Sequence, residues 1–156
     1  MTEPFAIVIG ALLGFMSGLV VAGMAYRQKS DELFFRSFDF LGGGTQRRNL
    51  GIAAIELYWS KKRHRRIAVA LLIGSALYLL LACKRKETAH ELHNLDRIMT
   101  LLLDAGARAS SSEAHFRRVL DAVRVARDPS RDSGLQVPAD WLHAWEAALQ
   151  RLTVAP

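Results

Sequence analysis

The sequence predicts an all-α protein in which an N-terminal transmembrane helix is followed by a helical bundle or a short helical-repeat-like domain. Two observations predict this class. The segment Phe5–Tyr26 is apolar and uncharged, and the four prolines lie at positions 4, 129, 138 and 156. Proline is the strongest helix breaker, so nothing in residues 5–128 forbids long helices.

The segment Phe5–Tyr26 has the length of a membrane span. Its 22 residues would extend about 33 Å as a helix, close to the ~30 Å thickness of a bilayer's hydrocarbon core. A cleaved signal peptide is the other interpretation. However, the apolar run is longer than a signal core, and no Lys or Arg precedes it. We therefore expect an uncleaved anchor over residues 5–26.

The charges after this segment predict its orientation. Residues 27–66 contain ten Lys or Arg and four Asp or Glu, and positively charged loops stay on the cytoplasmic side. We expect a plasma (inner) membrane protein, with residues 1–4 as a short N-terminus outside and the bulk of the chain in the cytoplasm. Residues 27–45 would form a juxtamembrane linker with a flexible glycine joint, and residues 46–156 the helical domain.

Small residues recur every fourth position inside the anchor, at Gly10, Gly14, Gly18 and Ala22. Residues four apart lie on one face of a helix. A stripe of small residues lets a second helix approach closely, and in lipid such packing drives association. This glycine zipper predicts helix packing with a copy of the chain or with another membrane protein.

The second apolar run, Ile67–Cys83, has two interpretations. Its 17 residues would extend about 25 Å as a helix, which is the lower limit for a span. Basic runs precede it at Lys61–Arg66 and follow it at Lys84–Lys86. Only a layout in which the run does not cross keeps both basic runs inside. We favour a buried helix of the domain, and a second span remains open.

The rest of the chain has the spacing of amphipathic helices. Asn49–Ser60 precedes the second apolar run, and Glu87–Asp104 carries apolar residues at positions 92, 95, 99 and 102, with Gly106 as the expected C-cap. Ser110 and Glu113 have the spacing of a capping box for the next helix. Pro138 opens the last helix. The domain should therefore contain five helices.

A basic cluster beside the anchor predicts contact with anionic lipid head groups, because each cation near such a surface is attracted to it. Nucleic acid is the less expected partner. Tyr58 and Trp59 lie next to the basic run and could stack on bases, but aromatic residues are equally expected at a membrane interface. The predicted lipid contacts are Arg47, Arg48, Lys61, Lys62, Arg63, Arg65 and Arg66.

Residues that could carry chemistry are few. Glu87 and His90 form an E-x-x-H pair, which di-metal bundles use, but no matching carboxylate pair occurs elsewhere in the sequence. They are weak metal candidates, and a solvated helix face is the favoured interpretation. No catalytic motif is present. We therefore expect neither a cofactor nor an enzymatic activity.

These patterns predict a non-catalytic, membrane-anchored helical interaction or adaptor module. Trp141 and Trp145, on the last helix, are candidates for binding an unknown cytoplasmic protein. One alternative is a two-span oligomerising protein that acts as a small pore or membrane-disrupting factor. Another is an accessory subunit of a larger membrane complex.

Overall fold

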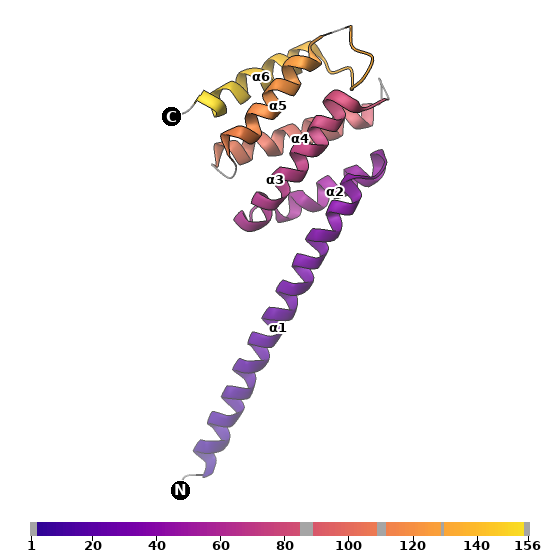
Figure 1. Cartoon of the computed structure of the whole chain (residues 1–156). Coiled ribbons are helices and arrows are strands. Elements are labelled where there is room, and N and C mark those ends of the chain that lie inside the picture. Colours follow the sequence, from indigo (N-terminus) through magenta and orange to yellow (C-terminus); the bar gives the residue numbers. More distant parts are fainter. Residues whose placement is uncertain (1–2, 85–88, 109–111, 129, 155–156) are drawn as a thin grey trace. The chain divides into compact units, whose positions relative to one another are not determined.

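The computed structural model describes residues 3–84, 89–108, 112–128 and 130–154, with side chains described from residue 20 to residue 153 within these ranges. Every regular element in these ranges is helical, as the sequence predicts, and none is a strand (Figure 1). The elements are α1 (Glu3–Leu41), α2 (Thr45–Tyr58), α3 (Lys62–Leu77), the π-helical turn η1 (Tyr78–Ala82), α4 (Ala89–Ala107), α5 (Glu113–Ala126) and α6 (Ala139–Val154).

The chain divides into two compact units, Met1–Arg36 and Ser37–Pro156. The first unit consists mainly of α1, which is one continuous helix. The sequence analysis placed a linker from residue 27 onward, but the helix continues to Leu41. The physical reason is that neither glycine nor proline occurs between residues 24 and 41, whereas three glycines follow directly.

The second unit is built around α3, which packs against α2, α4 and α5 (Figure 1). One face of α3 and η1 is core, because Ala68, Leu72, Ala76 and Leu79 are fully buried. Helix α5 packs against α3 and η1. Helix α6 packs against α5 and also contacts α4. Other large, fully buried side chains of this core are Ile52, Ile55, Leu80, Leu95, Ile98, Met99, Leu102 and Leu149.

The glycine expected to end α4 lies inside the helix, which runs on to Ala107. A side chain at Gly106 would collide with Leu152 of α6, whose Cγ lies 3.2 Å from the position of an added Cβ. Gly106 therefore permits close approach of α4 and α6 and is not a C-cap. The prediction was wrong because glycine suits both roles, and only the neighbouring helix distinguishes them.

The starts of α5 and α6 differ in how well the sequence anticipated them. The N-cap of α5 is Ser112, which shifts the helix start relative to the predicted capping box; Ser110 lies outside the described residues. The last helix begins directly after Pro138, as predicted. The carbonyl of Pro138 accepts a hydrogen bond from Leu142 N.

The carbonyl groups at the end of η1 are bound by the loop between α5 and α6. A helix end leaves carbonyls without partners in the helix, and they need donors from elsewhere. The donors and acceptors are Gly134 N to Cys83 O (2.8 Å), Leu135 N to Leu79 O (2.9 Å), Ser133 Oγ to Leu81 O (2.8 Å) and Arg131 Nη2 to Leu81 O (3.1 Å). The loop therefore caps a helix that is distant from it in sequence.

Among the residues with described side chains, one helical stretch, Lys62–Ala82, is long and apolar enough to cross a membrane. Its hydropathy is 1.8, and 44% of its apolar 18-residue window is buried within the protein. The same length and composition occur in core helices of soluble proteins. The stretch is thus compatible with membrane association, while one of its faces already forms part of the core of the second unit.

Candidate functional site

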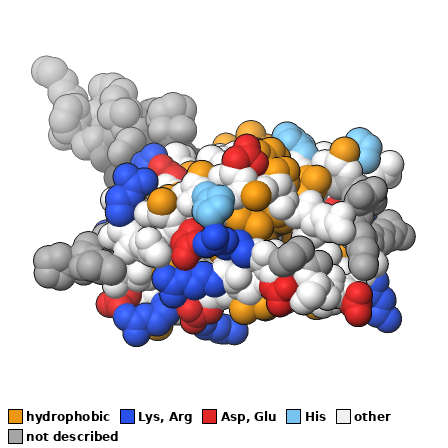
Figure 2. Space-filling model, turned by 90° about the horizontal axis from the view of Figure 1, so that it is seen from above, with side chains coloured by type: hydrophobic (Ala, Val, Ile, Leu, Met, Phe, Trp, Pro, Cys, Tyr) orange, Lys and Arg blue, Asp and Glu red, His pale blue; other side chains and the backbone are white. Residues whose placement is uncertain are grey.

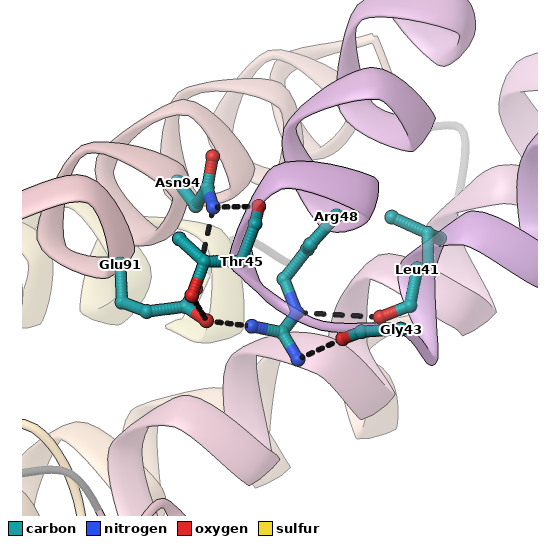
Figure 3. Close-up of polar contacts among 6 residues, drawn as sticks. All are labelled: Leu41, Gly43, Thr45, Arg48, Glu91 and Asn94. Carbon is teal, nitrogen blue, oxygen red and sulfur yellow. Dashed lines mark hydrogen bonds and ion pairs between the residues drawn. The ribbon is translucent and has the colours of Figure 1, made fainter.

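An ion pair between Arg48 of α2 and Glu91 of α4 lies at the centre of a buried polar cluster (Figure 3). The two residues are 5% and 4% exposed. Burying both charges costs several kcal/mol per ion unless hydrogen bonds replace the lost water. Whether this cluster is stable therefore depends on how completely its polar groups are hydrogen-bonded.

The helical register explains how the two charges become buried. Arg48 lies on the same face of α2 as Ile52 and Ile55, four and seven residues later, and both of these are fully buried. Glu91 lies four residues before Leu95 on the inner face of α4. Opposite charges thus occupy core positions of two helices that pack against each other.

Arg48 also holds the end of α1 and the glycines that follow it. Its Nε donates to Leu41 O at 3.2 Å and its Nη2 donates to Gly43 O at 3.1 Å, while Nη1 donates to Glu91 (Figure 3). The guanidinium lies over the Tyr78 ring, 5.5 Å from its centroid. The glycine joint, expected to be flexible, is thus fastened to α2 by the guanidinium.

The carboxylate of Glu91 is equally well paired. It accepts hydrogen bonds from Thr45 Oγ1 at 2.8 Å and from Asn94 Nδ2 at 3.2 Å, in addition to the one from Arg48. Burial raises the pKa of Glu91, but the hydrogen bonds from Arg48, Thr45 and Asn94 outweigh it and leave the pKa below the usual value. A carboxylate that stays charged is suited to holding α2 and α4 together and is poorly suited to proton transfer.

The lowered pKa of Glu91 predicts loss of stability in acid. Its contribution is present above the usual value of 4.5 and is lost as the pH falls through the lower, folded-state pKa. The stability difference between wild type and Glu91→Gln should be largest at about pH 7 and shrink towards about pH 3. Denaturant unfolding across this pH range measures the difference.

A matched control is Glu113→Gln, which removes a carboxylate from an exposed ion pair with Arg117. Exposed pairs contribute little to stability, so this variant should follow the wild type at every pH. A constant deficit of Glu91→Gln down to acid pH would contradict the proposed effect of Glu91 ionisation.

The structure separates the predicted lipid contacts into buried and exposed residues. Arg48 and Arg65 are buried, and Arg65 Nη1 donates to Trp59 O at 3.1 Å. Neither guanidinium lies at the surface, so the predicted lipid contact stays with the other members. The exposed ones are Arg47, Lys61, Lys62, Arg63 and Arg66.

The two predicted partner-binding tryptophans have different environments. Trp145 is buried, whereas Trp141 is half-buried, and their ring centroids lie 5.8 Å apart. Burial of Trp145 within the second unit therefore accounts for this residue without any partner. Trp141 is the member whose ring reaches the surface.

The remaining predicted sites are the glycine stripe of α1 and the two candidate metal ligands. Gly10, Gly14 and Gly18 lie within the continuous helix α1, but side chains before residue 20 are outside the description. Glu87 lies outside the described residues, and His90 is exposed. Within the described part of the chain, no three His, Cys, Asp or Glu side chains come together as metal ligands do.

No protein-family model, curated protein or solved structure matches the chain. The sequence analysis missed the Arg48–Glu91 pair, although a signal existed. Each residue interrupts an otherwise apolar helical stripe, and their charges are opposite.

Proposed function

We propose that this chain is a membrane-anchored helical module that binds another protein and catalyses no reaction itself. The observation that carries the proposal is α1, a continuous helix whose segment Phe5–Tyr26 has no charge. At its end, Val21 and Met24 are 65% and 64% exposed. A long helix with exposed apolar side chains suits a lipid environment far better than water.

The charges after Tyr26 support an orientation with the second unit in the cytoplasm. The stripe of Gly10, Gly14, Gly18 and Ala22 lies on one face of the helix, because the backbone of α1 is helical throughout. It would pack against another copy or against a second membrane protein. The latter partner would make the chain an accessory subunit of a larger complex.

The second unit would supply the surface for a cytoplasmic protein. Leu50 and Leu57 of α2 are 62% and 81% exposed and lie seven residues apart, close to two helical turns. Large apolar side chains exposed on one helix face are typical of interaction surfaces. Trp141 of α6 is a further candidate, since its ring is only half-buried.

Arginines in the middle of the anchor test the proposal. The wild-type chain should remain in the membrane pellet after alkaline carbonate extraction, whereas Phe15→Arg/Met16→Arg should enter the supernatant. Each arginine at the centre of a span costs about 2.5–3.5 kcal/mol on insertion scales. The matched control is Leu50→Arg/Leu57→Arg, which adds the same charge to an exposed face of α2 and should stay in the pellet.

Extraction of the wild-type chain by carbonate would contradict an anchor in residues 5–26. Reporter fusions after Tyr26, after Lys86 and at the C-terminus complete the test by giving the orientation. All three should report cytoplasm. If the last two report the outside, Lys62–Ala82, which has the length of a span, crosses the bilayer, and the two-span pore or membrane-disrupting function replaces the proposed one.

A further inference from the structure

Helix α3 is apolar on two faces, and only one of them is used in the core. The inner face includes the fully buried residues Ala68, Leu72 and Ala76. On the opposite side, Leu71 and Tyr78 are 38% and 47% exposed. We define the outer face of α3 as the exposed or half-buried residues Ile67, Ala70, Leu71, Gly74 and Leu77, together with Tyr78, the first residue of η1.

The outer face is one stripe by helical geometry. Each member lies three or four residues from at least one other member, the spacing that keeps side chains on one side of a helix. Between Arg66 and Lys84 the sequence holds no charged residue at all. A water-facing helix surface normally carries charged side chains, and this surface carries none.

Cations flank the stripe at both ends. Lys62 and Arg66 are exposed at the start of α3, and Lys84 is exposed just after η1. From residue 57 to residue 86 the chain has eight Lys or Arg and no Asp or Glu. The charge pattern therefore matches a planar anionic surface above an apolar layer, which is the profile of an anionic bilayer.

The α5–α6 side of the second unit has a different charge pattern. Arg124 and Arg127 there bind the same carboxylate of Glu146, at 3.0 and 2.7 Å. On the face drawn in Figure 2, basic and acidic side chains likewise lie next to one another. Mixed and paired charges are typical of a surface that faces water. The run of cations without Asp or Glu that flanks α3 in the sequence is therefore not a general property of the second unit.

A groove extends the outer face. A pocket of about 540 Å³ lies between α3 and the residues that precede α2. It is lined mainly by apolar residues, among them Phe38, Leu41, Ala70, Leu71, Gly74 and Tyr78. Acyl chains could enter such a hollow without desolvating a charge, because the Arg48 guanidinium beside it is already paired with Glu91.

We propose that the outer face of α3 lies in the head-group region of an anionic bilayer, with the helix axis parallel to the membrane plane. Apolar side chains would enter the acyl boundary, and Lys62, Arg66 and Lys84 would contact lipid phosphates. This second membrane contact does not require α1 to span the bilayer. The experiment below reports on the two separately.

The test uses the full chain in vesicles, with single nitroxide labels on a Cys83→Ala background. Labels at Leu71→Cys and Gly74→Cys report on the outer face; nothing lies within 4 Å of a Cβ added at Gly74. Val125→Cys, on the exposed side of α5, is the control, and Val21→Cys reports on α1. The readout is the ratio of collisions with oxygen, which enters lipid, to collisions with a water-soluble nickel chelate.

In vesicles of phosphatidylcholine mixed with phosphatidylglycerol, the ratio at Leu71 and Gly74 should be several-fold above that at Val125. It should drop towards the Val125 value in pure phosphatidylcholine. Arg66→Gln should weaken this lipid dependence, whereas Arg118→Gln, which removes an exposed arginine of α5, should not. Circular dichroism of each labelled variant verifies that the helical fold is intact.

Three results would overturn the inference. Ratios at Leu71 and Gly74 equal to that at Val125 would mean that water covers the face. Shielding from both oxygen and nickel would mean that a protein covers it. A depth at the centre of the bilayer would mean that α3 crosses. Independently, a water-exposed Val21 beside lipid-exposed Leu71 would refute the proposed anchor and leave this inference standing.

Discussion

Replacing Arg48 by methionine is expected to lower the free energy of unfolding by about 3–5 kcal/mol. The change removes a buried cation, leaves the Glu91 carboxylate buried without its charge partner, and deprives Leu41 O and Gly43 O of donors. Typical domains are stable by about 5–15 kcal/mol, so the loss would be a large fraction of the total. Denaturant unfolding of the detergent-solubilised chain, followed by circular dichroism, measures it.

The neighbouring Arg47 supplies the matched control. It is exposed, so Arg47→Met removes the same charge and should change stability by no more than about 0.5 kcal/mol. Arg48→Met/Glu91→Met should recover part of the loss, because no unpaired charge remains buried. Equal stability of Arg48→Met and Arg47→Met would show that the ion pair does not hold α2 and α4 together.

Replacing Gly134 by alanine is expected to destabilise the chain by about 2–5 kcal/mol. Its φ is 89°, which an L side chain rarely adopts, and an added Cβ would overlap the Leu80 carbonyl oxygen and lie 2.8 Å from the carbonyl carbon. Moving the loop away would weaken the bonds from Gly134 N to Cys83 O and from Leu135 N to Leu79 O. Thermal unfolding of the purified variant measures the cost.

Gly42→Ala is the control for this effect. An added Cβ at Gly42 meets nothing within 4 Å, so this change should be neutral or stabilise by up to about 1 kcal/mol, by lowering the entropy of the unfolded chain. If Gly134→Ala is as stable as Gly42→Ala, the loop does not cap η1 in the way described. A destabilisation by Gly134→Ala below the expected range, with the bonds from Gly134 N and Leu135 N unchanged, would contradict this capping as well.

Most helices could be predicted from local patterns. Pro138 marks the start of α6, and the spacing of Leu95, Met99 and Leu102 gives the buried face of α4. Such periodicity follows from the geometry of one helix and one solvent boundary, so it needs no knowledge of other elements. The helical class and the order of the helices were therefore accessible before the structure.

The roles of single polar residues and glycines were not accessible in this way. Arg47 and Arg48 are identical and adjacent in sequence, yet one is exposed and the other forms the centre of the polar cluster. Gly106 was expected to end a helix and instead accommodates Leu152. Each role depends on a residue about 40 or more positions away, and composition and local spacing carry no information about such contacts.

The sequence by itself determined that this chain is helical, that Phe5–Tyr26 is uncharged, and that Ile67–Cys83 is apolar between two basic runs. Only the tertiary structure decided which face of α3 is core and which stays uncovered, and which arginine is paired. The physical reason is that hydrophobicity and charge are properties of one residue, whereas burial and pairing are properties of the neighbours that the fold brings to it.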